Sequence, residues 1–373
     1  MPKFFATTPR GLELVLEKEL HDLGITKTKL GIAGVEFHTN WAGCYKANLE
    51  VTSASRILYP VLDFPAYEPD QIYHNVLKHD WTKYITVDQT LAMDSSVRDS
   101  GIRDLRIVAL KAKDAVVDQF VKKYGSRPNV DAENPDMQVS LRLVKNLCTV
   151  SLDTSGGSLH YRGYRDRGAP APLKENLAAA LIKMTGWDQS SPLMDPMCGS
   201  GTFCIEAALM GLKIPPGSFR TRFGFQRWLT FQTDAFKLLR DEIGQRVLDD
   251  VPFRVYGSDC DMRAVAAARA NTENAGTEVV TIFRRQDITE FIPAPTPGVL
   301  ITNPPYGERL GESQDLVDLY SKLGHQLKTH FQGWKAFVLT GNPTLAKAIG
   351  LEPKRSTRVY NGAIECQFLK FEP

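Results

Sequence analysis

The sequence lacks any apolar run long enough to cross a membrane, which takes about 20 consecutive apolar residues. Its first ten residues, MPKFFATTPR, also lack the apolar core of a secretory signal peptide. Both features argue against a membrane protein and a secreted one, so we expect a soluble, cytoplasmic protein with no membrane partner. The hydrophobic share of 43% and the charged share of 24% are ordinary for such a chain.

Cysteine is scarce and scattered. The six cysteines occupy positions 44, 148, 198, 204, 260 and 366, and none of them forms a Cys-x-x-Cys pair. This spacing argues against a disulfide framework or a zinc site and suits a reducing compartment. An excess of one charge is also missing, because 45 Lys and Arg against 43 Asp and Glu leave a net charge of +2. Any nucleic-acid surface must therefore come from local clusters of basic residues.

The length of 373 residues exceeds what one hydrophobic core normally holds, so several domains are expected. Residues 1–65 and 66–155 each alternate strand-like and helix-like patterns, which predicts two small α+β units. A glycine- and serine-rich stretch opens a predicted linker over 156–172. Over 173–373, apolar runs, glycine turns and helical patterns alternate, which predicts an α/β domain with a doubly wound, mainly parallel sheet.

A glycine turn follows the first strand of this predicted sheet. It reads Asp195-Pro196-Met197-Cys198-Gly199-Ser200-Gly201, and a helical pattern begins at Thr202. By glycine spacing alone this is a weak signal, because many nucleotide-binding proteins share it. The turn lacks the Gly-Lys-Ser/Thr ending of a phosphate-binding loop, and Asp195 would repel phosphate. An acidic strand end suits a cationic or amino-acid-like ligand instead.

Two further acidic residues follow the next two predicted strands. Asp259 ends the second strand, where a carboxylate can accept hydrogen bonds from both hydroxyls of a ribose. Asp287 comes after the third strand and is placed to reach an adenine amino group. An adenosine without phosphates but with a positive sulfur fits these carboxylates, so the pattern predicts S-adenosylmethionine as the cofactor.

The buried strand predicted to end at Thr302 is followed by Asn303-Pro304-Pro305-Tyr306. Two prolines can neither donate to a strand ladder nor continue a helix, so the chain must turn sharply at the edge where α/β sheets bind ligands. The turn carries an amide, a rigid carbonyl and an aromatic ring, which together suit capture of a nucleobase by its exocyclic amine. The alternative is a proline-rich turn that Asn303 merely caps.

Basic residues gather at two places before the predicted sheet. One group precedes and enters a helix predicted over 108–124, and the other interleaves with tyrosines in the linker. Such groups can contact phosphates and bases, although a solvated mixed-charge face and a solvated linker are the alternatives. The predicted RNA-binding residues are Arg98, Arg103, Arg106, Lys111, Arg162, Arg165 and Arg167.

An insertion over 214–233 separates the first helix of the predicted sheet from its second strand and is rich in arginines and aromatic residues. It forms either a lid over the active face or a packed excursion. We expect most of its aromatic side chains to be packed and its arginines, Arg220, Arg222 and Arg227, to be exposed.

The glycine turn followed by Asn303-Pro304-Pro305-Tyr306 resembles the class I S-adenosylmethionine-dependent methyltransferases that modify exocyclic amines. Over nearly its whole length the chain resembles the THUMP-containing RNA methyltransferases. Among these it is most similar to the group of the bacterial 23S rRNA guanine-N2 methyltransferase, in a version with a single methyltransferase half. The resemblance implies a ferredoxin-like unit, a THUMP RNA-binding domain and a Rossmann-like methyltransferase domain, with 23S rRNA or a ribosomal precursor as partner and no metal.

The resemblance also implies roles for individual residues. Asn303 and the carbonyl of Pro304 would accept hydrogen bonds from the target amine, while Tyr306 would stack on the base. Lys174 and Glu175 would help to close over the methionine portion of the cofactor. The implied catalytic residues are Asn303, Pro304, Pro305 and Tyr306, and the implied cofactor-binding residues are Asp195, Pro196, Met197, Cys198, Gly199, Ser200, Gly201, Asp259, Cys260, Asp287, Ile288 and Asn303.

Two other functions stay open on the sequence. An N6-adenine-specific DNA or RNA methyltransferase would share the Asn-Pro-Pro-Tyr motif, although an RNA-binding N-terminal half argues against DNA. A non-catalytic RNA-binding or ribosome assembly factor would keep the cofactor pocket without turnover, and the intact set from Asn303 to Tyr306 argues against it. The choice of guanine over adenine rests on the overall resemblance alone.

Overall fold

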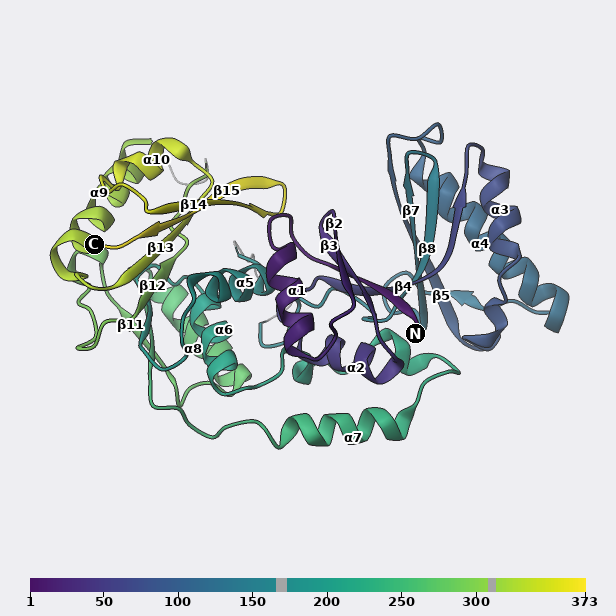
Figure 1. Cartoon of the computed structure of the whole chain (residues 1–373), viewed down its shortest axis with the longest axis horizontal. Coiled ribbons are helices and arrows are strands. Elements are labelled where there is room, and N and C mark those ends of the chain that lie inside the picture. The colour runs from purple at the N-terminus through teal and green to yellow at the C-terminus, as the bar shows by residue number, and fades with distance from the viewer. Residues whose placement is uncertain (166–172, 308–312) are drawn as a thin grey trace.

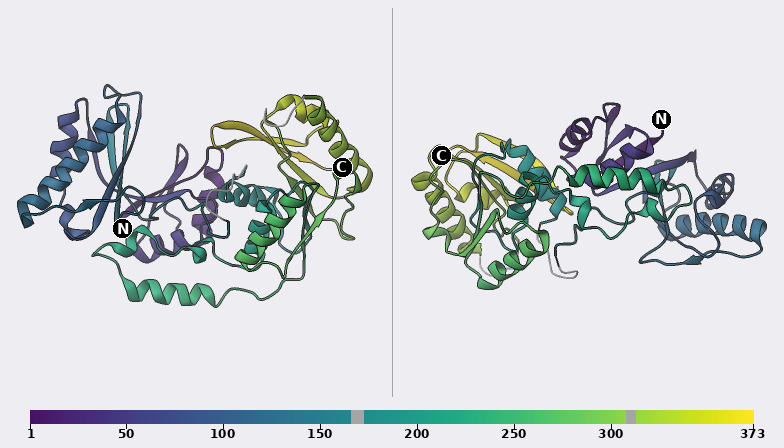
Figure 2. Two further views of the ribbon diagram at one scale, coloured as in Figure 1. Left: turned by 180° about the vertical axis from the view of Figure 1, so that it is seen from behind. Right: turned by 90° about the horizontal axis from the view of Figure 1, so that it is seen from below.

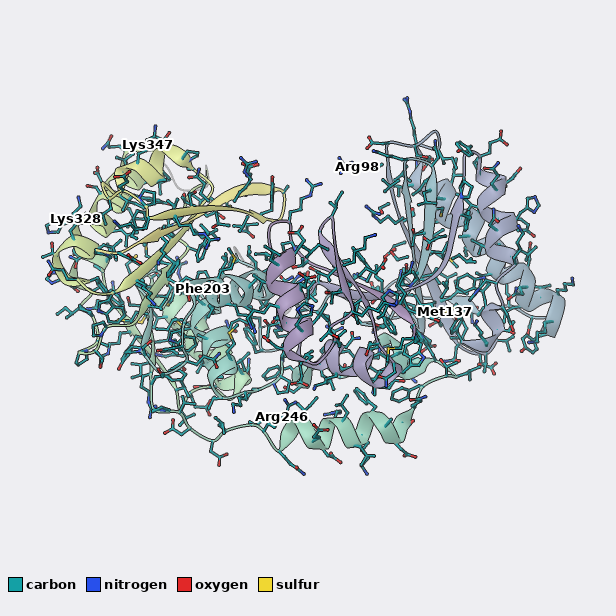
Figure 3. The ribbon with its side chains drawn as sticks, viewed as in Figure 1. Arg98, Met137, Phe203, Arg246, Lys328 and Lys347 are labelled. Carbon is teal, nitrogen blue, oxygen red and sulfur yellow. The ribbon has the colours of Figure 1, made fainter. Side chains whose placement is uncertain are left out.

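The computed structural model describes residues 1–165, 173–307 and 313–373. These residues form an eight-stranded sheet in the N-terminal half and a seven-stranded sheet in the C-terminal half of an elongated molecule (Figure 1). The views from behind and from below keep the two sheets toward opposite ends of the long axis (Figure 2). The labelled side chains follow this division, with Arg98 near one end and Lys328 and Lys347 near the other (Figure 3).

One long strand, β4 (Arg56–Pro65), joins the two predicted N-terminal units into a single sheet. It pairs antiparallel with β1 (Lys3–Thr7) on one edge and with β8 (Leu147–Asp153) on the other. Its register with β8 shifts between Pro60 and Leu62, as at a β-bulge. The strand order is β2 (Thr28–Gly31), β3 (Gly34–His38), β1, β4, β8, β7 (Met137–Val144), β5 (Thr90–Arg98) and β6 (Asn129–Val130).

Helices of this half pack on the sheet and bury one core. The helix predicted from Val108 begins earlier, at Leu105, because the side chain of Asp104 caps it and accepts a hydrogen bond from the Arg106 amide. The helical elements are α1 (Glu13–Asp22), α2 (Trp41–Glu50), α3 (Pro69–Leu77), the 3₁₀ turn η1 (Trp81–Lys83) and α4 (Leu105–Tyr124).

The C-terminal sheet is doubly wound and mainly parallel, which confirms the predicted class. Its order is β11 (Thr281–Arg285), β10 (Val255–Asp259), β9 (Leu193–Asp195), β12 (Val299–Thr302), β13 (Lys335–Thr340), β15 (Ile364–Phe371) and β14 (Arg355–Asn361). The first five strands are parallel, and β14 and β15 close the edge as an antiparallel hairpin. The chain runs outward in opposite directions from β9, so the switch point of the sheet lies between β9 and β12, where ligands bind in such folds.

Helices cover both faces of this sheet (Figure 1). All four residues of β12 are buried, as expected for a strand covered on both sides. The helical elements from residue 173 onward are α5 (Glu175–Thr185), α6 (Thr202–Gly211), η2 (Pro216–Phe219), η3 (Gly224–Arg227), α7 (Thr233–Gly244), α8 (Met262–Ala275), η4 (Ile288–Glu290), α9 (Ser313–His330) and α10 (Pro343–Ala348). Of these, η2, η3 and α7 contact α2 or β7 of the N-terminal half.

The insertion over 214–233 is a packed excursion, so the lid interpretation is wrong. Phe223, Phe225 and Trp228 are buried in the core of the N-terminal half, and the ring centroid of Phe225 lies 4.4 Å from that of Tyr45. The following helix α7 runs beneath α2 in Figure 1. The insertion therefore completes the N-terminal core instead of covering the active face.

The arginines of the insertion are less exposed than expected. Arg220 donates to the backbone carbonyls of Ser155 and Ser158, and Arg222 donates to the backbone and side chain of Asn134. The expectation of exposure holds for Arg227 alone, whose side chain is 58% exposed. Partly buried backbone carbonyls of loops need donors, and the guanidinium group of Arg220 supplies them for Ser155 and Ser158.

Polar contacts also tie α5 to the N-terminal half. Lys183 Nζ lies 3.1 Å from Glu19 Oε1, and Asn176 Nδ2 donates to Ser55 Oγ at 3.0 Å. Glu19 is buried and also accepts hydrogen bonds from the backbone amides of Thr52 and Ser53. The two halves are therefore joined by side-chain contacts at an interface as well as by the polypeptide chain.

Candidate active site

The glycine turn after β9 forms a tight corner beside β10. The amide of Cys198 donates to the carbonyl of Ser258 at 2.8 Å, which holds the turn against the neighbouring strand. Gly199 and Gly201 both have left-handed backbones, with φ of +53° and +84°. A Cβ on Gly201 would also lie 3.0 Å from the ring of Phe283. Glycine is therefore required at 201 for both conformation and space.

Asp195 is the buried acidic group at the base of the site. Its Oδ1 accepts hydrogen bonds from Thr302 Oγ1 at 2.8 Å and from the Met197 amide at 3.1 Å. Burial raises the pKa of Asp195 to about 7, and the hydrogen bond from Thr302 opposes that rise. The bond to Thr302 also connects β9 with β12, so Asp195 stands at the switch point of the sheet.

Asp259 faces the glycine turn from the end of β10. Its Oδ2 accepts from the Gly199 amide at 2.9 Å and its Oδ1 from the Asp261 amide at 3.0 Å. A carboxylate has about four acceptor positions, so both oxygens keep capacity for further donors.

A pocket of about 200 Å³ lies between the turn, the end of β10 and the end of β12. Of the residues predicted from the sequence, it brings together Asp195, Met197, Cys198, Gly199, Ser200, Asp259, Asn303 and Pro305. Three lining residues were missed, namely Leu173, Thr202 and Phe203. Thr202 and Phe203 begin α6 directly after the glycine turn. Their position next to the motif is the sequence signal that could have identified them.

The remaining predicted cofactor residues lie beside this pocket and do not line it. The amide of Gln286 donates to the carbonyl of Asp259 at 3.1 Å, which brings the segment after β11 to the same edge of the sheet. Asp287 is exposed and caps η4, where a hydrogen bond from the Thr289 amide lowers its pKa. Ile288 is buried and Cys260 is exposed. Pro196 and Gly201 shape the turn without lining the pocket.

Asn303 stands where β12 reaches the pocket. Its side-chain oxygen Oδ1 is buried and has no hydrogen-bond partner within the described part of the chain. An unsatisfied buried acceptor costs about 1–3 kcal/mol, so such an atom calls for an explanation. A turn-capping role would give this oxygen a backbone partner, and none is found among residues 1–165, 173–307 and 313–373.

Tyr306 follows on the other side of the two prolines and is half-buried. Its hydroxyl accepts from Asn361 Nδ2 at 3.0 Å, and the Cys366 thiol lies 3.7 Å away. Burial raises the pKa of Tyr306 to about 12, so the phenol stays neutral at physiological pH.

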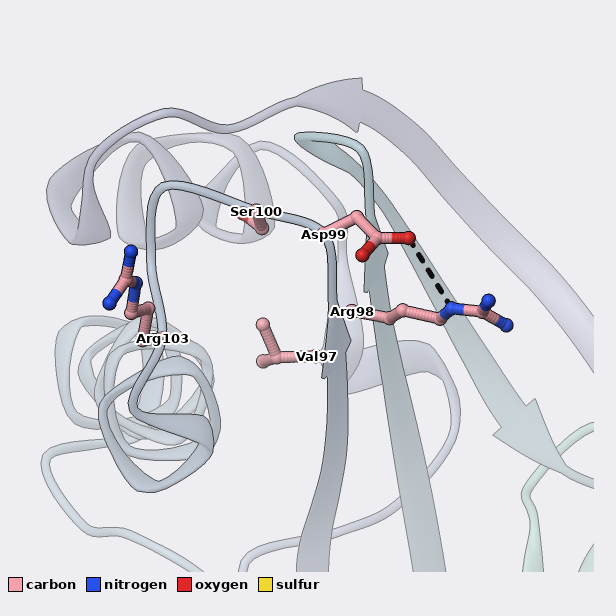
Figure 4. A pocket seen from close by; sticks show the side chains of 5 residues that line it. All are labelled: Val97, Arg98, Asp99, Ser100 and Arg103. Carbon is pink, nitrogen blue, oxygen red and sulfur yellow. Dashed lines mark ion pairs between the residues drawn. The ribbon is translucent and has the colours of Figure 1, made fainter.

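The first basic group lies on the surface at the end of β5 and the start of α4. The side chains of Arg98 and Arg106 are 64% and 83% exposed, and Arg103 is exposed as well. Lys111 is paired with Asp70 at 2.6 Å. A hollow of about 430 Å³ is lined by Val97, Arg98, Asp99, Ser100 and Arg103, and Arg98 pairs with Asp99 at 3.3 Å (Figure 4). The guanidinium groups of Arg98 and Arg103 point to opposite sides of the loop in this view.

The structure does not support the prediction that the linker arginines Arg162 and Arg165 contact RNA. The side chain of Arg162 is 1% exposed and lies 3.3 Å from Glu206 Oε2, so it cannot contact RNA from this position. Glu206 is a buried carboxylate of α6 that needs a charged partner, and Arg162 provides it. Arg165 is also nearly buried, pairs with Glu175 at 3.6 Å and donates to Thr202 Oγ1. Arg167 lies outside the described residues.

In the described ranges, no group of three or more His, Cys, Asp or Glu side chains is placed to hold a metal ion. Among the same residues, no helix combines the length and apolar character that crossing a membrane requires.

Comparison with protein families assigns all three parts of the chain. Residues 162–370 match the model of the RMKL-like methyltransferase domain. The chain belongs to the RMKL-like methyltransferase family. The regions before this methyltransferase domain match the THUMP domain over 66–153 and the RlmL ferredoxin-like domain over 3–58, which confirms the resemblance drawn from the sequence.

Comparison with individual relatives supports this family assignment. The chain is 43% identical to ribosomal RNA large subunit methyltransferase K/L of Syntrophotalea carbinolica, over 99% of this chain and 53% of that protein. It therefore spans about half the length of the K/L relatives it matches. The Synechocystis protein named "Putative RNA methyltransferase slr0064" is 38% identical over 99% of this chain and 96% of its own length. The crystal structure of SMU.472 complexed with SAH superposes with a TM-score of 0.91 at 32% identity, covering 99% of this chain and 97% of that one.

Proposed function

We propose that the chain is an S-adenosylmethionine-dependent RNA methyltransferase that methylates an exocyclic amine, guanine N2 of 23S rRNA. Membership of the RMKL-like family and the names of the K/L relatives support methylation of large-subunit rRNA. SAH in the crystal structure of SMU.472, which is similar over its full length, supports the cofactor.

The main support for the proposal is that the side-chain oxygen of Asn303 is buried without a hydrogen-bond partner among the described residues. A buried acceptor with no protein partner in the described residues, at the rim of a pocket that also holds Asp195 and Asp259, is ready for a donor from outside the chain. An exocyclic amine of a flipped base is such a donor. The glycine turn leaves room for backbone contact with a ligand, and the acidic groups suit an adenosine that carries positive charge.

When bound, S-adenosylmethionine supplies an electrophilic methyl group. The residues of the chain do the rest by position and polarity. Asp195, with Cys198 to Gly201, would hold the amino-acid portion, and Asp259 would accept from the ribose hydroxyls. Asn303 Oδ1 and the Pro304 carbonyl would accept the two hydrogens of the amine, which turns its lone pair toward the cofactor. Preorganised acceptors of this kind act through positioning and electrostatics.

The THUMP domain, residues 66–153, would bind the RNA. Arg98, Arg103 and Arg106 are exposed there and can each contact a phosphate, whereas Arg162 is needed inside the protein. Arg98 and Arg103 point to opposite sides of their loop in Figure 4, so they would contact different stretches of the RNA phosphate backbone.

The test is methyl transfer from labelled S-adenosylmethionine to 23S rRNA transcribed without modifications, with 16S rRNA and duplex DNA as parallel substrates. Nucleoside mass spectrometry of the product should find N2-methylguanosine in 23S rRNA. N6-methyladenosine in RNA would overturn the base assignment, and N6-methyladenine in the duplex would overturn RNA as the substrate. Cofactor binding without transfer to any substrate would indicate the non-catalytic factor instead.

A further inference from the structure

The side chain of Tyr306 is held at its hydroxyl and along its ring by parts of the chain remote from its motif. Asn361, the last residue of β14, donates to the hydroxyl at 3.0 Å. Cys366 in β15 brings its thiol to 3.7 Å from the same oxygen. The ring also packs against both hydrophobic clusters of the C-terminal sheet. The hairpin at the edge of the sheet thus holds the tip of the ring on which, by the resemblance drawn from the sequence, the target base would stack.

Gly341 lies against one face of this ring. A Cβ on Gly341 would lie 2.9 Å from Cδ2 and Cε2 of Tyr306, closer than real Cβ contacts come. Gly341 follows β13, whose last residue, Thr340, pairs with Gln367 of β15 in the sheet. The neighbouring backbone is therefore fixed, and the missing side chain at 341 leaves the space in which the ring lies.

We propose that Asn361 is a positioning residue for methyl transfer, because its amide fixes the tip of the Tyr306 ring over Gly341 and so sets the plane on which the target base stacks. This inference rests on the proposed function and extends it to a residue outside both sequence motifs. It concerns the orientation of a captured base and not the affinity for RNA, which phosphate contacts dominate.

The physical reason is the freedom of an aromatic side chain at its second torsion, which is broad unless packing or a hydrogen bond restricts it. Packing against Gly341 limits one side of the ring, and polar contacts with the hydroxyl limit its tip. Loss of the Asn361 amide removes the shorter of the two contacts, at 3.0 Å against 3.7 Å. The base would then stack over a wider range of angles, and its amine would face the acceptors of Asn303 for a smaller fraction of the time.

The experiment is a double-mutant cycle with N361A, Y306F and the double variant of the full chain. Single-turnover rates are measured with labelled S-adenosylmethionine and saturating 23S rRNA transcript. We expect N361A to slow methyl transfer about threefold to tenfold, the worth of one neutral hydrogen bond, with the cofactor Kd unchanged. In the Y306F background the same substitution should have almost no further effect, because the partner oxygen is already gone.

Two further variants separate positioning from stability. E365A removes an exposed side chain of the same hairpin that pairs with Arg358 at 3.1 Å and does not touch Tyr306, so it should leave the rate unchanged. N361D keeps a short polar group to which the neutral Tyr306 hydroxyl can donate, so it should restore most of the rate lost in N361A. If N361A fails to fold, Y306F and N361D still test the contact from its two ends.

Equal slowing by N361A in the chain that keeps Tyr306 and in the Y306F background would overturn the inference, since it would mean a general effect on the hairpin. A normal rate in N361A would overturn it as well. Neither outcome would touch the proposed function, which fails separately if the unaltered protein transfers no methyl group to RNA.

Discussion

Replacing Asn303 by alanine separates chemistry from stability at the proposed active site. The side-chain oxygen Oδ1 of Asn303 is buried without a partner in the described residues. Its removal therefore breaks no hydrogen bond between this oxygen and any described residue. It deletes an acceptor that is left for the target amine.

The two expected magnitudes have opposite signs. Loss of one preorganised acceptor should slow methyl transfer about 10²–10³-fold, or roughly 2.7–4 kcal/mol in the barrier. Loss of an unsatisfied buried acceptor should relieve part of a desolvation penalty of about 1–3 kcal/mol. The variant should thus be nearly inactive and at least as stable as the original protein, with cofactor affinity largely kept.

The assay pairs single-turnover rates with melting temperatures and calorimetric Kd values for S-adenosylmethionine. Asn342→Ala is the matched control, because Asn342 caps α10 by accepting from the amides of Thr344 and Leu345. The control should lose about 1 kcal/mol of stability and keep its turnover. An Asn303→Ala protein that is destabilised yet fully active would refute the catalytic reasoning.

Three further outcomes follow from the same geometry. Asp259→Ala should weaken S-adenosylmethionine binding by roughly 1.5–3 kcal/mol and leave RNA binding intact, and an unchanged calorimetric Kd would contradict this. Because burial raises the pKa of Asp195 to about 7, cofactor affinity should be full above that pH and fall below it, by up to about tenfold per pH unit. Equal Kd values at about pH 8 and about pH 5.5 would exclude this titration from the binding step. Arg98→Ala and Arg103→Ala should each lower the salt slope of RNA binding by about one, whereas Arg162→Ala should cost about 3–5 kcal/mol of stability in thermal unfolding.

The class of the C-terminal sheet and much of its site followed from local pattern. Buried parallel strands read as continuous apolar runs, and β12 lies where the run ending at Thr302 predicts it. Asp195 and Asp259 each end a parallel strand and Asn303 directly follows one, and the carboxyl ends of such strands meet at one edge. Their convergence on one pocket was therefore predictable without knowledge of side-chain contacts.

Contacts between distant segments were not predictable. Arg162 has the composition of an exposed linker residue, and only the buried carboxylate of Glu206, 44 positions later, explains its burial. The aromatic residues of the insertion pack against Tyr45, which no local pattern indicates. The hydrogen bond from Asn361 to Tyr306 spans 55 positions and depends on the pairing of β15 with β13, which places the hairpin beside that strand.

The packing of the insertion has a consequence for the order in which the chain folds during synthesis. The core of the N-terminal half includes Phe225, Phe236 and Ile243, which are made only after β9 and α6 of the other half. Domains usually fold as they emerge from the ribosome, and waiting apolar surface favours aggregation. Here the first half cannot close its core until the second half is partly synthesised. The RNA-binding and methyltransferase halves therefore mature together, and a fragment ending near residue 155 would leave the ribosome with Tyr45 uncovered.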